Sequence, residues 1–140
     1  MTGPFGRLDH IAIVVPDTDA AVAVWRDLIG LPFKFSEVVQ AGTIRLTHLD
    51  LGSTDLQLVE PLVADHPLMD FLLANGPGLH HVCFEAEDLD AVFGPDWPHP
   101  LRAVQDLPHE ATKGRQAVFL DNAATAAVIE LTTALTADRP

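Results

Sequence analysis

The feature that most constrains the fold of this chain is an internal repeat. The segment "RLDHIAIVVPDTDAAV", which begins at Arg7, resembles "GLHHVCFEAEDLDAV", which begins at Gly78. The residue pairs that coincide at an offset of 71 residues are His10 with His81, Asp17 with Asp88, and Asp19 with Asp90. Because a repeated segment marks a repeated structural unit, we expect the chain to contain two copies of one module.

The first module is expected at about residues 7–62. "LDHIAIVV" alternates and is rich in β-branched residues, which favours a strand. Asp17 can cap a helix after this strand, and Gly30 supplies its end. Three further strands are expected at residues 33–39, 43–51 and 55–60. The module therefore has the order β-α-β-β-β.

The second module is expected at about residues 78–133, after a connecting segment at about residues 63–77. In that segment Asp65 can cap a short helix that ends at Asn75 and Gly76. The module begins with the strand "LHHVCFEA", and prolines shorten the helix that starts at "DLDAVF". Its other strands are expected at residues 101–104, 115–120 and 127–132. We expect one α+β domain over residues 1–140.

The charge balance narrows the range of partners. Eight basic and twenty acidic residues give a formal charge of −12 over 140 residues. Nucleic acid and anionic membranes both require clustered Lys and Arg, so we expect neither as a partner. Cys83 is the only cysteine, which fits a reducing compartment. No apolar run has the length of a membrane span or the character of a signal peptide, and we expect a cytoplasmic protein.

Four polar residues recur at equivalent places in the two modules. Side chains alternate along a strand, so His10 shares a face with Ala12 and Val14, while the β-branched residues of the opposite face pack on the helix. His10 is therefore expected to point away from the helices. "LQLV" at residues 56–59 matches "IELT" at residues 129–132, which superposes Gln57 on Glu130.

A buried polar residue between apolar neighbours is costly unless something binds it. Packing of two modules about a pseudo-twofold axis would bring the four residues to one place. Two imidazoles and two oxygen donors suit a divalent transition metal such as Co, Zn, Mn, Ni or Fe. The candidate metal ligands are His10, Gln57, His81 and Glu130.

These motifs resemble the vicinal oxygen chelate superfamily, which includes glyoxalase I, bleomycin-resistance proteins and extradiol dioxygenases. The resemblance covers residues 7–133 and implies a cupped, barrel-like mixed sheet with helices outside. The segments "LGSTDLQLVEPL" and "AVFLDNAATAAVIEL" extend it beyond the two repeated ones. Within the superfamily the chain is most similar to methylmalonyl-CoA epimerases, whose metal set of His, Gln or Glu, His and Glu corresponds to the four candidate ligands.

The resemblance implies a metal-dependent isomerase that removes a proton next to a carbonyl group through a metal-stabilised enolate. The family's glutamate base would fall at or near Ala41, so Glu37, His48 and Glu130 are the candidate acid/base residues. An acyl-CoA thioester is the implied substrate, although Lys34, Lys113 and Arg115 are few cations to meet its phosphates. The resemblance also implies a homodimer.

Three other functions stay open on the sequence: a metal-free small-molecule binding or resistance protein, a glyoxalase-type lyase, and an extradiol dioxygenase. Cys83 is expected to be a small buried hydrophobe rather than a nucleophile. His80 is expected to face opposite to His81 and to have a structural role. No role follows for the histidines among Pro and Asp, which are His66, His99 and His109.

Overall fold

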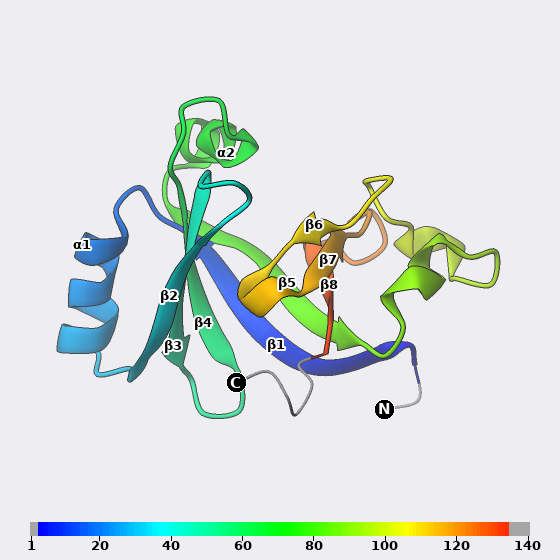
Figure 1. Cartoon of the computed structure of the whole chain (residues 1–140), viewed down its shortest axis with the longest axis horizontal. Helices are drawn as coiled ribbons and strands as arrows, with labels where there is room; N and C mark the ends of the chain where they lie inside the picture. The colour runs from blue at the N-terminus through cyan, green and yellow to red at the C-terminus, as the bar shows by residue number, and fades with distance from the viewer. Residues whose placement is uncertain (1–2, 135–140) are drawn as a thin grey trace. The chain divides into compact units, whose positions relative to one another are not determined.

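The computed structural model describes residues 3–134. Among them, eight strands are hydrogen-bonded in the order β2-β3-β4-β1-β5-β8-β7-β6, with parallel and antiparallel pairs in one mixed sheet (Figure 1). The backbone packs as two compact units. We call residues 10–80 the Gln57 unit and residues 3–9 with 81–134 the Glu130 unit. β1 (Phe5–Val14) contributes its first half to the Glu130 unit and its second half to the Gln57 unit. The predicted α+β fold class is confirmed.

The Gln57 unit contains the predicted strand, helix and three strands. β2, β3 and β4 pair antiparallel in sequence, and β4 pairs parallel with β1. A π-helical turn continues α1. Among residues 3–134, no helix is long and apolar enough to cross a membrane. The bounds are α1 Thr18–Val22, the π-helical turn Ala23–Leu28, β2 Phe33–Val39, β3 Ile44–Asp50, β4 Asp55–Pro61 and α2 Pro67–Asn75.

Asp17 begins α1 as predicted, because its side chain accepts a hydrogen bond from the Ala20 N–H at 3.2 Å. The expected cap of α2 is wrong. His66, not Asp65, caps this helix, and its Nδ1 accepts from the Leu68 N–H at 3.1 Å. A neutral imidazole has one lone pair that serves this purpose, although histidine is not among the preferred capping residues.

The two faces of β1 pack differently in the Gln57 unit. Ile13 and Val15 pack in a cluster with Val22 of α1, as the alternation predicts. Ala12 and Val14, which share the face of His10, pack in another cluster against apolar residues of α2. The face that carries His10 thus contacts α2 at its far end, a contact that the sequence does not predict because its pattern gives no position for α2.

The Glu130 unit has the second module's strands with much shorter helices. Its elements are β5 Gly78–Ala86, β6 His109–Glu110, β7 Gln116–Phe119, β8 Ile129–Thr133 and 3₁₀ turns at Leu89–Phe93, His99–Leu101 and Thr112–Gly114. Asp88 caps the first of these turns, which replaces the predicted shortened helix. The predicted strand at 101–104 is wrong: Ala103 makes only an isolated bridge to Leu120, because Pro98 and Pro100 bend this segment into a turn.

The strand register repeats the sequence repeat. In the parallel pair of β1 and β4, Ala12 lies opposite Gln57. In the parallel pair of β5 and β8, Cys83 lies opposite Glu130. In each module the histidine is two residues before the opposed residue, so it shares a sheet face with the polar residue of the fourth strand. The repeat therefore places one histidine and one oxygen donor on a common face of each strand pair.

Candidate functional site

Three polar residues are buried together in the Gln57 unit. His10, Gln57 and His48 come from β1, β4 and β3, and each is at most 4% exposed. His48 is the Cα partner of Gln57 in the antiparallel pair of β3 and β4. The rings of His10 and His48 meet edge to face, with centroids 5.7 Å apart. This unit thus buries two imidazoles beside one side-chain amide.

Both ring nitrogens of His48 have side-chain partners. Nδ1 lies 2.8 Å from Asp55 Oδ2, and Nε2 lies 3.1 Å from Gln57 Nε2. Asp55 also accepts from Lys34 Nζ at 2.8 Å. Burial raises the pKa of Asp55, but the hydrogen bonds from His48 and Lys34 and the charge of Lys34 outweigh it, so the pKa lies below its ordinary value.

In the Glu130 unit, Glu130 is buried between two histidines. Its Oε1 lies 3.2 Å from His81 Nε2, and its Oε2 lies 2.7 Å from His109 Nε2. Gln105 Oε1 lies 3.1 Å from the other nitrogen of His109, whose ring stacks on Phe119. Sequence reasoning missed His109, because its segment carries no periodic signal and has no counterpart in the first module.

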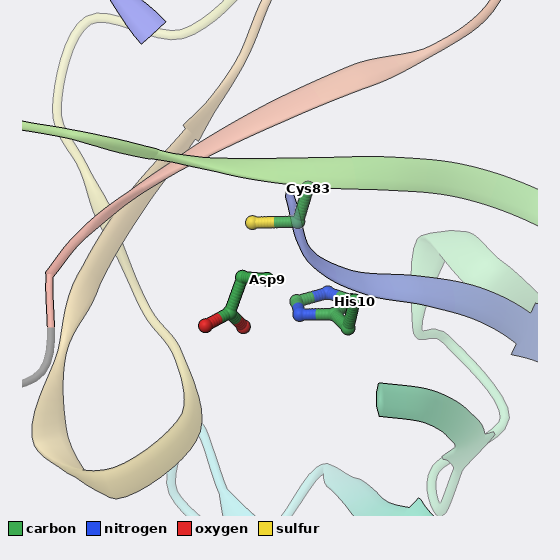
Figure 2. Close-up of side chains that lie close together, drawn as sticks. All are labelled: Asp9, His10 and Cys83. Atoms are coloured by element: carbon green, nitrogen blue, oxygen red, sulfur yellow. The ribbon is translucent and has the colours of Figure 1, made fainter. Parts of the chain in front are cut away.

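Asp9 and Cys83 lie on the neighbouring strands β1 and β5, and Figure 2 shows them with His10, the next residue of β1. Arg115 donates to both Asp9 carboxylate oxygens, at 2.8 and 3.0 Å. Cys83 is fully buried, and burial, with the charges of Glu130 and Asp9, raises the pKa of its thiol well above the ordinary value. Asp9 is thus paired with Arg115, and Cys83 stays a thiol near neutral pH.

Three other residues considered in the sequence analysis are Glu37, Ala41 and His80. Glu37 is half-buried on the face of β2 that also carries Phe35, and Phe35 stacks on His48 with ring centroids 4.6 Å apart. Ala41 is exposed at the β2–β3 turn with a left-handed φ of 56°. His80 is half-buried and meets Phe71 edge to face, consistent with a structural role.

Two of the three cations considered for coenzyme A phosphates are engaged elsewhere. Arg115 is 3% exposed and belongs to the buried pair with Asp9. Lys34 contacts Asp55. The sequence alone does not separate a buried arginine from a surface one, because its partner Asp9 is 106 residues away. Arg115 is therefore not a phosphate ligand in this structure.

The donor chemistry of each unit fits a divalent transition metal. Each unit supplies one buried imidazole and one buried side chain with an oxygen donor on the same face of a strand pair. Imidazole nitrogen with carboxylate or amide oxygen is a set that Zn, Co, Mn, Ni and Fe accept.

A family model and a sequence relative both match most of this chain. The model of the glyoxalase/bleomycin resistance protein/dioxygenase superfamily matches residues 9–119. Mitochondrial methylmalonyl-CoA epimerase of Mus musculus is 33% identical over 118 residues. That match covers 82% of this chain and 65% of the mouse protein, so the chain spans just under two thirds of this relative's length.

Two solved structures are similar in fold to this chain over almost its whole length. A variant of Streptomyces coelicolor methylmalonyl-CoA epimerase in complex with 2-nitronate-propionyl-CoA is 31% identical, with a TM-score of 0.82 over 97% of this chain and 99% of the other. A methylmalonyl-CoA epimerase in complex with methylmalonyl-CoA and NH4⁺ is 30% identical, with a TM-score of 0.80 and the same two coverages.

Proposed function

Because the chain belongs to the glyoxalase/bleomycin resistance protein/dioxygenase superfamily, we propose that it is a metal-dependent epimerase of a methylmalonyl-CoA-like thioester. The observation that carries the proposal is the repeated register, with Ala12 opposite Gln57 and Cys83 opposite Glu130. It gives each unit one histidine and one oxygen donor on a common face. The names of the similar epimerases, and the acyl-CoA compounds named with two of them, support the substrate class.

We assign the metal to His10 and Gln57 of the Gln57 unit and to His81 and Glu130 of the Glu130 unit. A bound divalent cation would supply positive charge that stabilises the negative charge of a deprotonated thioester. Among the four residues only Glu130 is a carboxylate. Gln57 is neutral, so the site residues leave more positive charge for an anionic substrate than two carboxylates would.

Proton transfer requires groups other than His48. Both nitrogens of His48 are engaged, and the ring is 1% exposed. Glu130, buried and flanked by two histidines, is the proposed proton acceptor, and half-buried Glu37 is the proposed second acid/base group. An epimerase removes a proton from one face of a carbon and returns it on the other, which suits two carboxyl groups from different strands.

Three further parts of the proposal concern the oligomeric state, the location in the cell and the contact with coenzyme A. A homodimer and a cytoplasmic location stay predictions, the first from the family resemblance and the second from the sequence. With Arg115 buried and Lys34 bound to Asp55, Lys113 of the β6–β7 turn is the cation proposed to meet coenzyme A phosphates. A dimer is checked by light scattering of the purified chain, and coenzyme A contact by the salt dependence of substrate affinity.

The test is exchange of the α-proton of methylmalonyl-CoA with solvent deuterium, followed by NMR, on protein reconstituted with Co²⁺. The wild type is expected to exchange the proton at least about 100-fold faster than buffer, and Glu130→Gln to lose this acceleration. Glu87→Gln makes the same chemical change at an exposed acid and is expected to behave as the wild type.

A Co²⁺-loaded wild type that binds methylmalonyl-CoA without exchange would point to a binding protein and end the epimerase proposal. Oxygen consumption that requires iron would instead identify a dioxygenase.

A further inference from the structure

We infer that Asp55 and His48 are positioning residues that fix the side-chain amide of Gln57, so that its oxygen rather than its NH2 group is presented to the metal. This inference deepens the proposed function and rests on it for the role of Gln57. It concerns residues that lie entirely within the Gln57 unit. Neither Asp55 nor a positioning role for His48 follows from the sequence repeat, because the corresponding positions of the second module hold Val128 and Phe119.

The hydrogen bonds define the proton positions one after another. Asp55 accepts at both oxygens, from Lys34 Nζ at Oδ1 and from His48 Nδ1 at Oδ2, each at 2.8 Å. A carboxylate donates nothing, so His48 carries its proton on Nδ1 and offers a lone pair at Nε2. The atom of Gln57 that faces Nε2, at 3.1 Å, is the amide nitrogen, a donor. The amide oxygen is therefore turned away from His48.

The geometry of the strands holds this arrangement in place. Asp55 is two residues before Gln57 on β4, so the two side chains share a face. His48 is opposite Gln57 on β3. Its ring stacks on Phe35 at an interplanar angle of 12° and is 1% exposed, so it has no room to rotate without displacing its neighbours.

A similar arrangement surrounds the corresponding residue of the Glu130 unit. His109 Nε2 lies 2.7 Å from Glu130 Oε2, and Gln105 anchors the other ring nitrogen. Here too the imidazole stacks on a phenyl ring, that of Phe119. Each polar residue of a fourth strand is thus held by an anchored histidine. Such outer contacts are what orient the ligands of metal sites.

The hydrogen bonds that link Asp55, His48 and Gln57 predict a specific effect of Asp55→Asn. Lys34 donates to one oxygen of residue 55, so the asparagine keeps its oxygen toward Lys34 and turns its NH2 group to His48. His48 Nδ1 must then accept, and its proton moves to Nε2. Gln57 then turns its amide oxygen to this new donor and its NH2 group to the cation. An amide NH2 group cannot ligate a cation. Metal affinity is expected to fall about 10- to 100-fold.

The first measurement needs neither metal nor activity. The ¹⁵N NMR signals of His48 in the metal-free wild type are expected to show the proton on Nδ1, and those of Asp55→Asn the proton on Nε2. The second measurement is the Co²⁺ dissociation constant of Asp55→Asn, His48→Phe and the double variant. His48→Phe retains an aromatic ring against Phe35 and removes both nitrogens.

If Asp55 acts only through His48, Asp55→Asn weakens Co²⁺ binding in the wild type and changes it less than about twofold in the His48→Phe background. Asp50→Asn is the matched control. Asp50 is opposite Asp55 on β3, and its side chain accepts from the Gly52 N–H instead. This variant is expected to bind Co²⁺ within about twofold of the wild type.

The outcomes separate the inference from the proposed function. A wild type that binds Co²⁺ but has the His48 proton on Nε2, or an Asp55→Asn effect that persists in full without His48, overturns the inference alone. A wild type with the expected proton positions that binds no Co²⁺ overturns the metal function and leaves the orientation of Gln57 established.

Discussion

The guanidinium of Arg115 binds both carboxylate oxygens of Asp9, at 2.8 and 3.0 Å, with both side chains at most 4% exposed. The residues are 106 positions apart in the sequence, so the pair ties the turn before β7 to β1. Burial lowers the pKa of Arg115, but the hydrogen bond and charge of Asp9 outweigh this effect, and the pKa lies above its ordinary value. Arg115 therefore stays charged throughout the pH range in which the protein is handled.

Arg115→Met is expected to lower the free energy of unfolding by up to about 3–5 kcal/mol, because the buried Asp9 carboxylate loses its two Arg115 hydrogen bonds and keeps the contact with half-exposed Arg7 at 3.1 Å. Denaturant titration measures this loss. The double variant Arg115→Met with Asp9→Leu removes both charges and is expected to recover most of it. Equal stability of the single and double variants would show that burial of an unpaired charge is not the cause.

His66 makes the start of α2 sensitive to pH. Burial lowers the pKa of His66, against a smaller opposing effect of Asp65, and the cap requires a neutral ring because Nδ1 accepts from Leu68. A His with a lowered folded-state pKa stabilises the protein above its unfolded pKa of about 6.5. This contribution is lost as the pH falls through the folded-state value. The protection factors of the first α2 amides against hydrogen exchange are therefore expected to fall below about pH 6.5.

His66→Ser retains a capping oxygen without a titrating ring. The fall in protection at low pH is expected to disappear in this variant, while His66→Ala is expected to cost about 1 kcal/mol of helix stability above about pH 6.5, where the wild-type cap is intact. The same pH response in His66→Ser and the wild type would assign it to another group.

Cys83 is expected to be unreactive in the folded protein. It is fully buried, and burial raises the pKa of its thiol, so the reactive thiolate is absent near neutral pH. Incubation with a thiol reagent, followed by mass spectrometry, is expected to modify the chain only under unfolding conditions. Modification of the native protein at the rate of a free thiol would contradict the buried position.

His109→Phe tests the contact with Glu130 in the second unit. The phenyl ring preserves the stacking on Phe119 and removes the nitrogen that lies 2.7 Å from Glu130 Oε2. Metal affinity is expected to fall about 10- to 100-fold, as for other outer contacts of metal ligands. Isothermal titration with Co²⁺ measures it, with His99→Phe, at an exposed turn position, as the control. An unchanged affinity would show that His109 has no part in the site.

The sequence predicts the strands of the first module well, because each is a short alternating or apolar run between turn residues. It predicts β2 at its observed bounds, Phe33–Val39. The second module is less predictable. Its proline-rich segment places an expected strand at 101–104, whereas the observed second strand is the two-residue β6 at His109–Glu110. So short a strand depends on its partner β7 rather than on any pattern of its own.

The candidate ligands are predictable because they repeat, whereas the residues that hold them are not. His10 and Gln57 have counterparts at corresponding module positions, and the structure buries all four. The contacts of Asp55 and His109 do not repeat in sequence, and each depends on side-chain orientation in a packed interior. Arg115 was considered for phosphate binding for the same reason, since its buried partner is distant in sequence.

The most direct test of the account is the metal content of the chain and of two single variants, one in each unit. Protein purified without chelator and titrated with Co²⁺ is expected to bind one ion per chain, and His10→Ala and His81→Ala are each expected to lose it. Loss in both variants is the result expected of the proposed four-residue site. Binding of one ion that survives either substitution, or no binding by the wild type, would contradict the proposed site.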